Sequence, residues 1–120
     1  MDKKKILIID DDPDVAKAFN EALSVNGFKG DVYTDSLSAL SNLKNNINGY
    51  DRVVCDIRMP GKSGIEVAKE VKKSIPGLRI ILMSSNENDY YENNEAKDIS
   101  DDFVLKPKDF DGFLKLLSNS

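Results

Sequence analysis

Short apolar runs alternate along this chain with longer stretches in which apolar residues recur every three or four positions. The short runs show too little apolar–polar alternation for a sheet with one face in water, so they predict strands buried on both faces. The longer stretches predict amphipathic helices. The expected strands are Lys5–Asp10, Gly30–Thr34, Arg52–Asp56, Arg79–Ser84 and Phe103–Leu105.

The helical stretches are bounded by residues that cap or stop helices. The expected starts are Asp12 with Pro13, Ser36 or Asp35, Ser63 and Asp109, and the expected stops are Asn26-Gly27, Asn45-Asn46 and Pro76-Gly77. We expect the apolar stripe of each helix to face the sheet. These stripes are Val15, Ala18, Phe19, Ala22 and Leu23; Leu37, Leu40 and Leu43; Ile65, Ala68, Val71 and Ile75; and Phe110, Phe113, Leu114 and Leu117.

Residues 86–98 break this pattern. By position they should form the fourth helix, but four asparagines and two aspartates are poor residues for a helix interior. Tyr90, Tyr91 and Ala96 supply only a thin apolar stripe. We therefore predict a short, frayed or mobile helix, which forms either an ordinary solvated face or an adjustable surface.

Strand and helix alternate five times with short connections, which implies right-handed crossovers and a parallel sheet between two layers of helices. The expected fold class is therefore α/β, with a doubly wound five-stranded sheet in three layers. No linker or internal repeat divides the chain, and its 120 residues suffice for a single core. We expect residues 1–120 to form one domain.

The composition excludes several classes of function. The net charge is −4, and no stripe of Lys or Arg suits direct binding of nucleic acid. No signal peptide or membrane-spanning apolar run is present, so we expect a cytoplasmic protein with no membrane contact. The single cysteine, Cys55, excludes an intrachain disulfide and is expected to pack in the core. Without histidine, the chain cannot itself offer a phosphohistidine.

Candidate chemistry gathers at the carboxyl ends of four expected strands, which carry Asp10-Asp11-Asp12, Asp56, Ser84-Ser85 and Lys106-Pro107. In an open parallel sheet these ends lie side by side and bind ligands. A lone acidic run before a helix is often only a cap, and capping accounts for Asp12. The coincidence of four such strand ends predicts a site for a divalent cation and a phosphoryl group.

Mg²⁺ prefers oxygen ligands and is usually held by one or two carboxylates together with phosphate and water. The candidate direct ligands are therefore Asp11 and Asp56, with Asp10 acting through a water molecule. The backbone carbonyl of Arg58 is a candidate for one further oxygen.

The residues at these strand ends closely resemble the receiver domain of two-component response regulators. The resemblance rests on Ile-Leu-Ile-Ile-Asp10-Asp11-Asp12-Pro13, Val-Val-Cys-Asp56-Ile-Arg-Met-Pro60-Gly61, Ile-Leu-Met-Ser84-Ser85 and Asp102-Phe103-Val-Leu-Lys106-Pro107. It implies a flavodoxin-like sheet with the strand order 2-1-3-4-5. It also implies that Asp56 accepts a phosphoryl group from a sensor histidine kinase or a phosphotransfer protein, with Mg²⁺ or Mn²⁺ as cofactor.

The resemblance implies roles for further residues. Ser84 would hydrogen-bond one phosphoryl oxygen and Lys106 would pair with another, while Ser84 and Phe103 would form the switch. Arg58 and Asn86 match positions that tune the lifetime of the phosphoryl-aspartate. Such a domain catalyses its own phosphorylation and dephosphorylation but is not a turnover enzyme.

The resemblance also implies partners. A downstream protein would bind the face made by residues 86–98, the fifth strand and the last helix, and the domain would be a monomer or a weak phosphorylation-dependent homodimer. Two features depart from the family pattern: many receivers have tyrosine where this chain has Phe103, and the asparagine-rich segment replaces much of an apolar helix face.

Two alternative functions remain open from the sequence. The first is a pseudo-receiver, an interaction module that works without phosphorylation. The second is a haloacid-dehalogenase-type phosphatase that uses Asp10, because Asp10-x-Asp12 matches the acid pair of that class. Against the second, Asp14 stands where that motif has threonine or valine, and the chain is short for the class.

Overall fold

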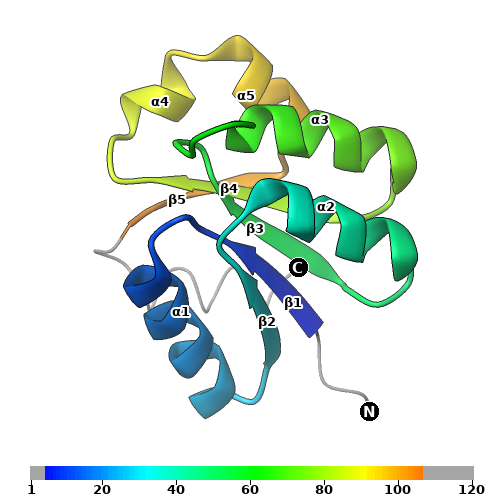
Figure 1. Cartoon of the computed structure of the whole chain (residues 1–120). Coiled ribbons are helices and arrows are strands. Elements are labelled where there is room, and N and C mark those ends of the chain that lie inside the picture. The colour runs from blue at the N-terminus through cyan, green and yellow to red at the C-terminus, as the bar shows by residue number, and fades with distance from the viewer. Residues whose placement is uncertain (1–4, 107–120) are drawn as a thin grey trace.

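The structure, a computed structural model, describes residues 5–106, and in this range five strands form one parallel sheet. The strands lie in the order β2-β1-β3-β4-β5 (Figure 1), which confirms the expected doubly wound α/β fold. Four boundaries differ from expectation by a single residue: the end of β1, both ends of β2 and the start of β5. The strands are β1 (Lys5–Ile9), β2 (Lys29–Tyr33), β3 (Arg52–Asp56), β4 (Arg79–Ser84) and β5 (Asp102–Leu105).

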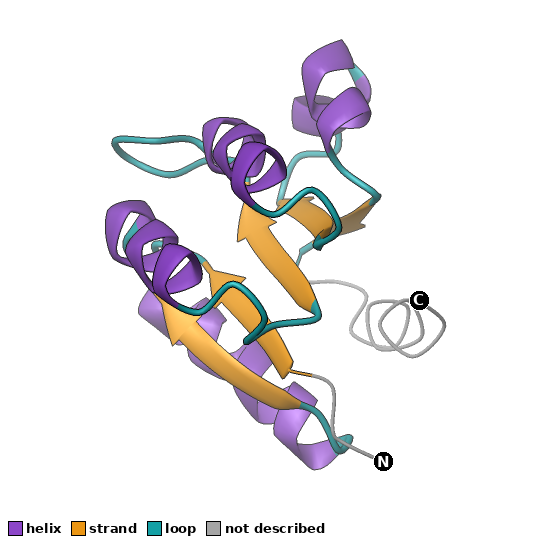
Figure 2. Ribbon diagram, turned by 90° about the vertical axis from the view of Figure 1, so that its right-hand side faces the viewer, coloured by secondary structure: helices purple, strands orange, loops and turns teal. Residues whose placement is uncertain are grey.

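Helices cover both faces of the sheet (Figures 1 and 2). Among the helices of residues 5–106, α1 covers one face, while α2, α3 and α5 pack on the other. Parallel strands require such helices. Each crossover must carry the chain back to the end of the sheet at which the strands begin, and a helix packed on one face makes that connection. The helices are α1 (Pro13–Val25), α2 (Ser36–Asn45), α3 (Gly64–Ser74), α4 (Asn88–Tyr91) and α5 (Asn94–Ile99).

Alternate residues of the central strands supply two apolar cores. Leu7 and Ile9 of β1 pack in the core under α2 and α3, whereas Ile6 and Ile8 pack in the core under α1. This alternation explains why the strands read as continuous apolar runs. Cys55 is fully buried in the first core, and burial raises the pKa of its thiol far above the ordinary value. The prediction that Cys55 packs in the core is confirmed.

The helix starts follow the capping rules. The side chain of Asp12 accepts hydrogen bonds from two backbone N–H groups in the first turn of α1, and Asp35, not Ser36, caps α2. Ser63 and Glu66 form a reciprocal capping box at the start of α3. Because each cap pairs N–H groups that the helix leaves unbonded, it fixes where the preceding loop ends.

Two residues that were expected to face the sheet are exposed. In α1 the buried stripe is Ala16, Phe19 and Leu23, and Ala18 lies outside it. In α2 Leu37 is 63% exposed. The apolar pattern alone did not show that small residues are buried in their place: Ala16 in α1, and Ser36 and Ala39 in α2. The buried residues of α2 are Ser36, Ala39, Leu40 and Leu43.

The asparagine-rich segment forms two short helices, α4 and α5, instead of one. The break comes at Asn93, whose side chain accepts a hydrogen bond from the backbone N–H of Ala96 and so caps α5. Asparagine competes with the helix for backbone groups, and here it starts a new helix in place of continuing the old one. The prediction of a short helix is confirmed, and its fraying or mobility stays a prediction.

The expected last helix, from Asp109 with Phe110, Phe113, Leu114 and Leu117, lies outside the described residues. The longest helix within residues 5–106 is α1, with 13 residues. A helix that crosses a bilayer needs about 20 apolar residues. None of the described helices is long and apolar enough for this.

Gly64 lets the start of α3 touch the end of β3. A Cβ atom at this position would collide with the carbonyl group of Asp56, lying 2.8 Å from the carbonyl carbon, and would lie 2.9 Å from the Cα of Ile57. The N–H of Gly64 donates a hydrogen bond of 2.9 Å to the carbonyl oxygen of Ile57. The atoms of Asp56 and Ile57 that the Cβ would meet belong to the backbone, so they cannot rotate away as a side chain would.

We predict that Gly64→Ala destabilises the protein by about 3 kcal/mol, at the upper end of the usual cost of overpacking, because backbone must move to admit the methyl group. Urea unfolding measures this change. Gly77→Ala is the matched control, since a Cβ at Gly77 meets nothing within 4 Å. The control should change stability by less than about 1 kcal/mol. Equal stabilities of the two variants would contradict the close approach of Gly64 to Asp56.

Candidate functional site

The sheet register brings the chemical side chains to one edge. Asp56 pairs with Met83 of β4, and Ser84 pairs with Leu105, the residue before Lys106. Asp10 directly follows β1, and its N–H donates to the carbonyl oxygen of Tyr33 at 3.1 Å.

Asp10 and Asp56 are buried carboxylates joined by one ammonium group. Asp10 is fully buried and Asp56 is 4% exposed. The Nζ of Lys106 lies 2.7 Å from Oδ2 of Asp10 and 2.9 Å from Oδ2 of Asp56. The other oxygen of Asp10 accepts a hydrogen bond from the backbone N–H of Asp12 at 3.0 Å. Lys106 therefore holds together two acids that are 46 residues apart in the chain and would otherwise repel each other.

Burial raises the pKa of Asp56 to about 6, against the opposing effect of the hydrogen bond from Lys106. Burial alone would lower the pKa of Lys106, but its hydrogen bonds to Asp10 and Asp56 outweigh this and raise the pKa above its ordinary value. Lys106 is therefore a fixed positive charge at neutral pH. The carboxyl of Asp56, in contrast, has a pKa close enough to neutral pH that nearby cations influence how fully it is ionised.

The acidic cluster has the donor set of a hard divalent cation. One carboxylate oxygen each from Asp10, Asp11 and Asp56 lies within 4.8 Å of the others. Asp11 is exposed, so the cluster opens to solvent on that side. All three donors are oxygens, which Mg²⁺ prefers, and Lys106 neutralises only one of the three potential negative charges. The residues present fit Mg²⁺.

Ser84 and Arg58 meet at a residue that the sequence analysis missed, Asp89. The hydroxyl of Ser84 donates to Oδ2 of Asp89 at 2.6 Å, and Arg58 donates to both oxygens of Asp89 at 2.6 and 2.8 Å. The guanidinium of Arg58 holds the pKa of Asp89 below its usual value. No sequence signal identifies this pairing, because it depends on the direction in which α4 leaves β4.

Asn86 hydrogen-bonds to Ser84, and Phe103 contacts the two tyrosines that follow Asp89. The N–H of Asn86 donates to the hydroxyl oxygen of Ser84 at 3.1 Å, while its side chain accepts from the N–H of Asn88. Phe103 is half-buried and stacks on Tyr90 with ring centroids 4.6 Å apart, and Tyr91 meets Phe103 edge-on. The roles predicted for Asn86 and Phe103 stay predictions.

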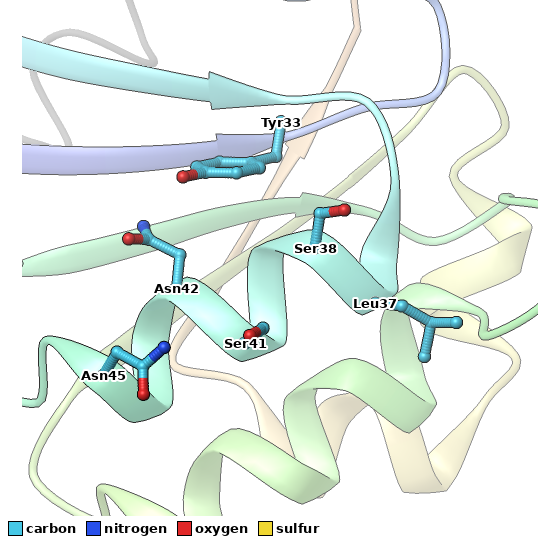
Figure 3. A pocket seen from close by; sticks show the side chains of 6 residues that line it. All are labelled: Tyr33, Leu37, Ser38, Ser41, Asn42 and Asn45. Carbon is cyan, nitrogen blue, oxygen red and sulfur yellow. The ribbon is translucent and has the colours of Figure 1, made fainter.

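A separate pocket lies between the end of β2 and the outer side of α2, seen in Figure 3. It carries no charged side chain, and no member of the acidic cluster lines it. We therefore assign it no part in the chemistry. Its lining residues are Tyr33, Leu37, Ser38, Ser41, Asn42 and Asn45.

A family model of the response regulator receiver domain matches residues 6–118 of this chain. The chain therefore belongs to the family of response regulator receiver domains. It is a domain of two-component signalling proteins and not a typical turnover enzyme, and this family membership favours a receiver over the phosphatase alternative.

Among solved structures, the response regulator TrrA of Thermotoga maritima in complex with Mg²⁺-BeF is 32% identical over 97% of each chain, with a TM-score of 0.87. The complex of TrrA with the histidine kinase ThkA matches at 31% identity and a TM-score of 0.84, again over 97% of each chain. The transcriptional regulatory protein ZraR of Klebsiella oxytoca is 30% identical over 115 residues, or 96% of this chain and 26% of ZraR. The chain spans between 22% and 48% of the length of the curated relatives compared.

We predict that Lys106→Met lowers the stability of the metal-free protein by about 3 kcal/mol, because two buried carboxylates lose their shared cation. Lys69→Met is the matched control, since the ion pair of Lys69 with Glu95 is about half exposed on both sides. The control should cost less than about 1 kcal/mol. Urea unfolding in the presence of a chelator compares the two, and an equal loss would show that the buried position of Lys106 contributes nothing special.

Proposed function

We propose that Asp56 is the phosphoacceptor of this receiver domain. One of its carboxylate oxygens attacks the phosphorus of a phosphohistidine, the P–N bond breaks, and the imidazole leaves with the bonding electron pair and takes up a proton. The phosphohistidine comes from a sensor histidine kinase or a phosphotransfer protein, since this chain has no histidine. The observation that carries the proposal is the Lys106 ammonium 2.9 Å from the buried carboxylate of Asp56.

In-line phosphoryl transfer depends mainly on positioning and on charge neutralisation. We propose that Lys106 supplies a positive charge to one phosphoryl oxygen and that the Ser84 hydroxyl donates to another. Lys106 is suited to this because its two hydrogen bonds already fix the ammonium beside the acceptor. The same groups would serve in reverse when water removes the phosphoryl group, so the domain would catalyse both its own phosphorylation and its own dephosphorylation.

We propose that Asp11, Asp56 and the backbone carbonyl of Arg58 bind Mg²⁺ or Mn²⁺ directly, with Asp10 acting through water. When bound, the cation neutralises negative charge on the transferring phosphoryl group. The complete burial of Asp10, with both oxygens already hydrogen-bonded, suits an indirect role. That TrrA was crystallised with Mg²⁺-BeF supports the assignment.

Phosphorylation would switch binding to a downstream protein. We propose that Ser84 and Phe103 transmit the change to the surface made by residues 86–98, β5 and the last expected helix. The exposed Tyr91 and the stacked Tyr90 offer aromatic contact area on this surface. The complex of TrrA with ThkA supports a histidine kinase as the upstream partner. Arg58 and Asn86 would set the lifetime of the phosphoryl-aspartate.

We further propose that residues 1–120 make up one receiver domain. The match of the family model to residues 6–118 supports this extent. It would work in the cytoplasm as a monomer or a weak phosphorylation-dependent homodimer, without itself binding nucleic acid. The net charge of −4 supports the last point.

We predict that acetyl phosphate labels the wild-type protein in the presence of Mg²⁺ and that Asp56→Asn abolishes the label. Intact-protein mass spectrometry detects the added phosphoryl group. Asp12→Asn is the matched control and should label normally, because asparagine caps a helix as well as aspartate does. An unlabelled wild-type protein would favour a pseudo-receiver that works without phosphorylation.

We predict that millimolar Mg²⁺ raises the Tm, because the cation binds the folded acidic cluster and not the unfolded chain. At a concentration 100 times the Kd the gain is about 2.7 kcal/mol. Asp11→Asn should fold normally, since Asp11 is exposed, yet lose most of the shift. Differential scanning calorimetry with and without Mg²⁺ measures this. An unchanged shift in Asp11→Asn would remove Asp11 from the ligand set.

A further inference from the structure

The hydroxyl of Ser84 is already committed in this structure. It donates its single proton to Oδ2 of Asp89 at 2.6 Å, and its oxygen accepts from the N–H of Asn86 at 3.1 Å. A serine hydroxyl has one proton, so it cannot donate to Asp89 and to a phosphoryl oxygen at the same time. Whichever acceptor binds Ser84 excludes the other.

Arg58 fixes Asp89 in the position from which it accepts the hydrogen bond of Ser84. Its Nε and one terminal nitrogen donate to the two oxygens of Asp89 in a two-point ion pair, although the Arg58 side chain is 65% exposed. Asp89 itself is only 17% exposed, so water competes weakly for its oxygens. Two-point pairing of guanidinium with carboxylate fixes the orientation of the acid as well as its position. Asp89 is thereby aimed at Ser84.

We propose that Asp89 is a latch that holds the unphosphorylated conformation by competing with the phosphoryl group for the Ser84 hydroxyl. The inference rests on the proposed role of Ser84 at the phosphorylated site. Asp89 is a positioning residue, since it acts through Ser84 and Arg58 and contacts neither Asp56 nor Lys106 in the hydrogen bonds described for residues 5–106. When phosphorylation withdraws Ser84, Asp89 loses one of its two partners.

The latch also ties the site to the aromatic surface. Asp89 lies in the four-residue helix α4, next to Tyr90 and Tyr91, which pack on Phe103 of β5. The backbone of Arg58 belongs to the loop after Asp56, and its N–H lies 3.4 Å from Oδ1 of Asp56. The Arg58–Asp89 pair thus joins the loop of the phosphoacceptor to α4. Release of Ser84 weakens the hold on a helix too short to be stable without such contacts.

The test compares the affinity for beryllofluoride, a phosphoryl mimic, at fixed Mg²⁺ by isothermal titration calorimetry. Asp89→Ala should bind on the order of tenfold more tightly than wild type, because no hydrogen bond to Asp89 must break. Glu95→Ala is the matched control: it removes another acid from the same segment, together with its ion pair to Lys69, and leaves Ser84 untouched. This control should bind as wild type does.

Ser84→Ala separates the latch from a general effect of removing a negative charge. In the Ser84→Ala background, Asp89→Ala should gain less than about twofold, since the hydroxyl for which the two acceptors compete is gone. A general charge effect would persist in full in that background, and this result would overturn the latch. Thermal unfolding checks each variant, and Asp89→Leu, which keeps a side chain of similar length but has no hydrogen-bond acceptor, replaces the alanine variant if that one does not fold.

The outcomes also separate the latch from the proposed function. Beryllofluoride binding by wild type, with no gain in Asp89→Ala or Asp89→Leu, overturns the latch and leaves Asp56 as the acceptor. If wild type binds no better than Asp56→Asn, both the latch and the acceptor assignment fail.

Discussion

The ammonium of Lys106 between the carboxylates of Asp10 and Asp56 is the interaction on which this site depends. Two buried acids at neighbouring strand ends repel each other, and without a cation one of them would have to take up a proton or reach solvent. Lys106 neutralises part of that charge from inside the fold. It leaves a cluster that is still acidic, open on the side of Asp11, and therefore suited to a second, exchangeable cation.

The sheet makes this arrangement possible. Buried parallel strands allow few registers, because a slip of one residue would turn apolar side chains away from their core. Once β1, β3, β4 and β5 are in register, the residues at their ends have little freedom to move apart. The close approach of Gly64 to Asp56 then fixes how the loop after β3 leaves the sheet. Rigid strands and a tight loop thus place charged groups where they would not gather on their own.

Much of this could be predicted from the sequence. Continuous apolar runs identified the buried strands, and capping residues such as Asp12 and Ser63 identified the helix starts, because both signals are local. Ala18 and Leu37 were placed wrongly, since helical periodicity does not show which side of an apolar stripe the sheet covers. The carboxyl ends of parallel strands must meet, so the gathering of Asp10, Asp56 and Lys106 follows from topology. The pairing of Asp89 with Ser84 and Arg58 does not, because it depends on the path of a loop.

The burial of Cys55 has a practical consequence. Its thiol is the only one in the sequence, has no solvent exposure, and is shifted strongly toward the unreactive protonated form. A cysteine introduced at an exposed position of α4 would therefore be the one thiol open to a maleimide dye or spin label in the native protein. The fold thus provides a background on which the movement of a single helix can be followed spectroscopically, with no need to replace the native cysteine first.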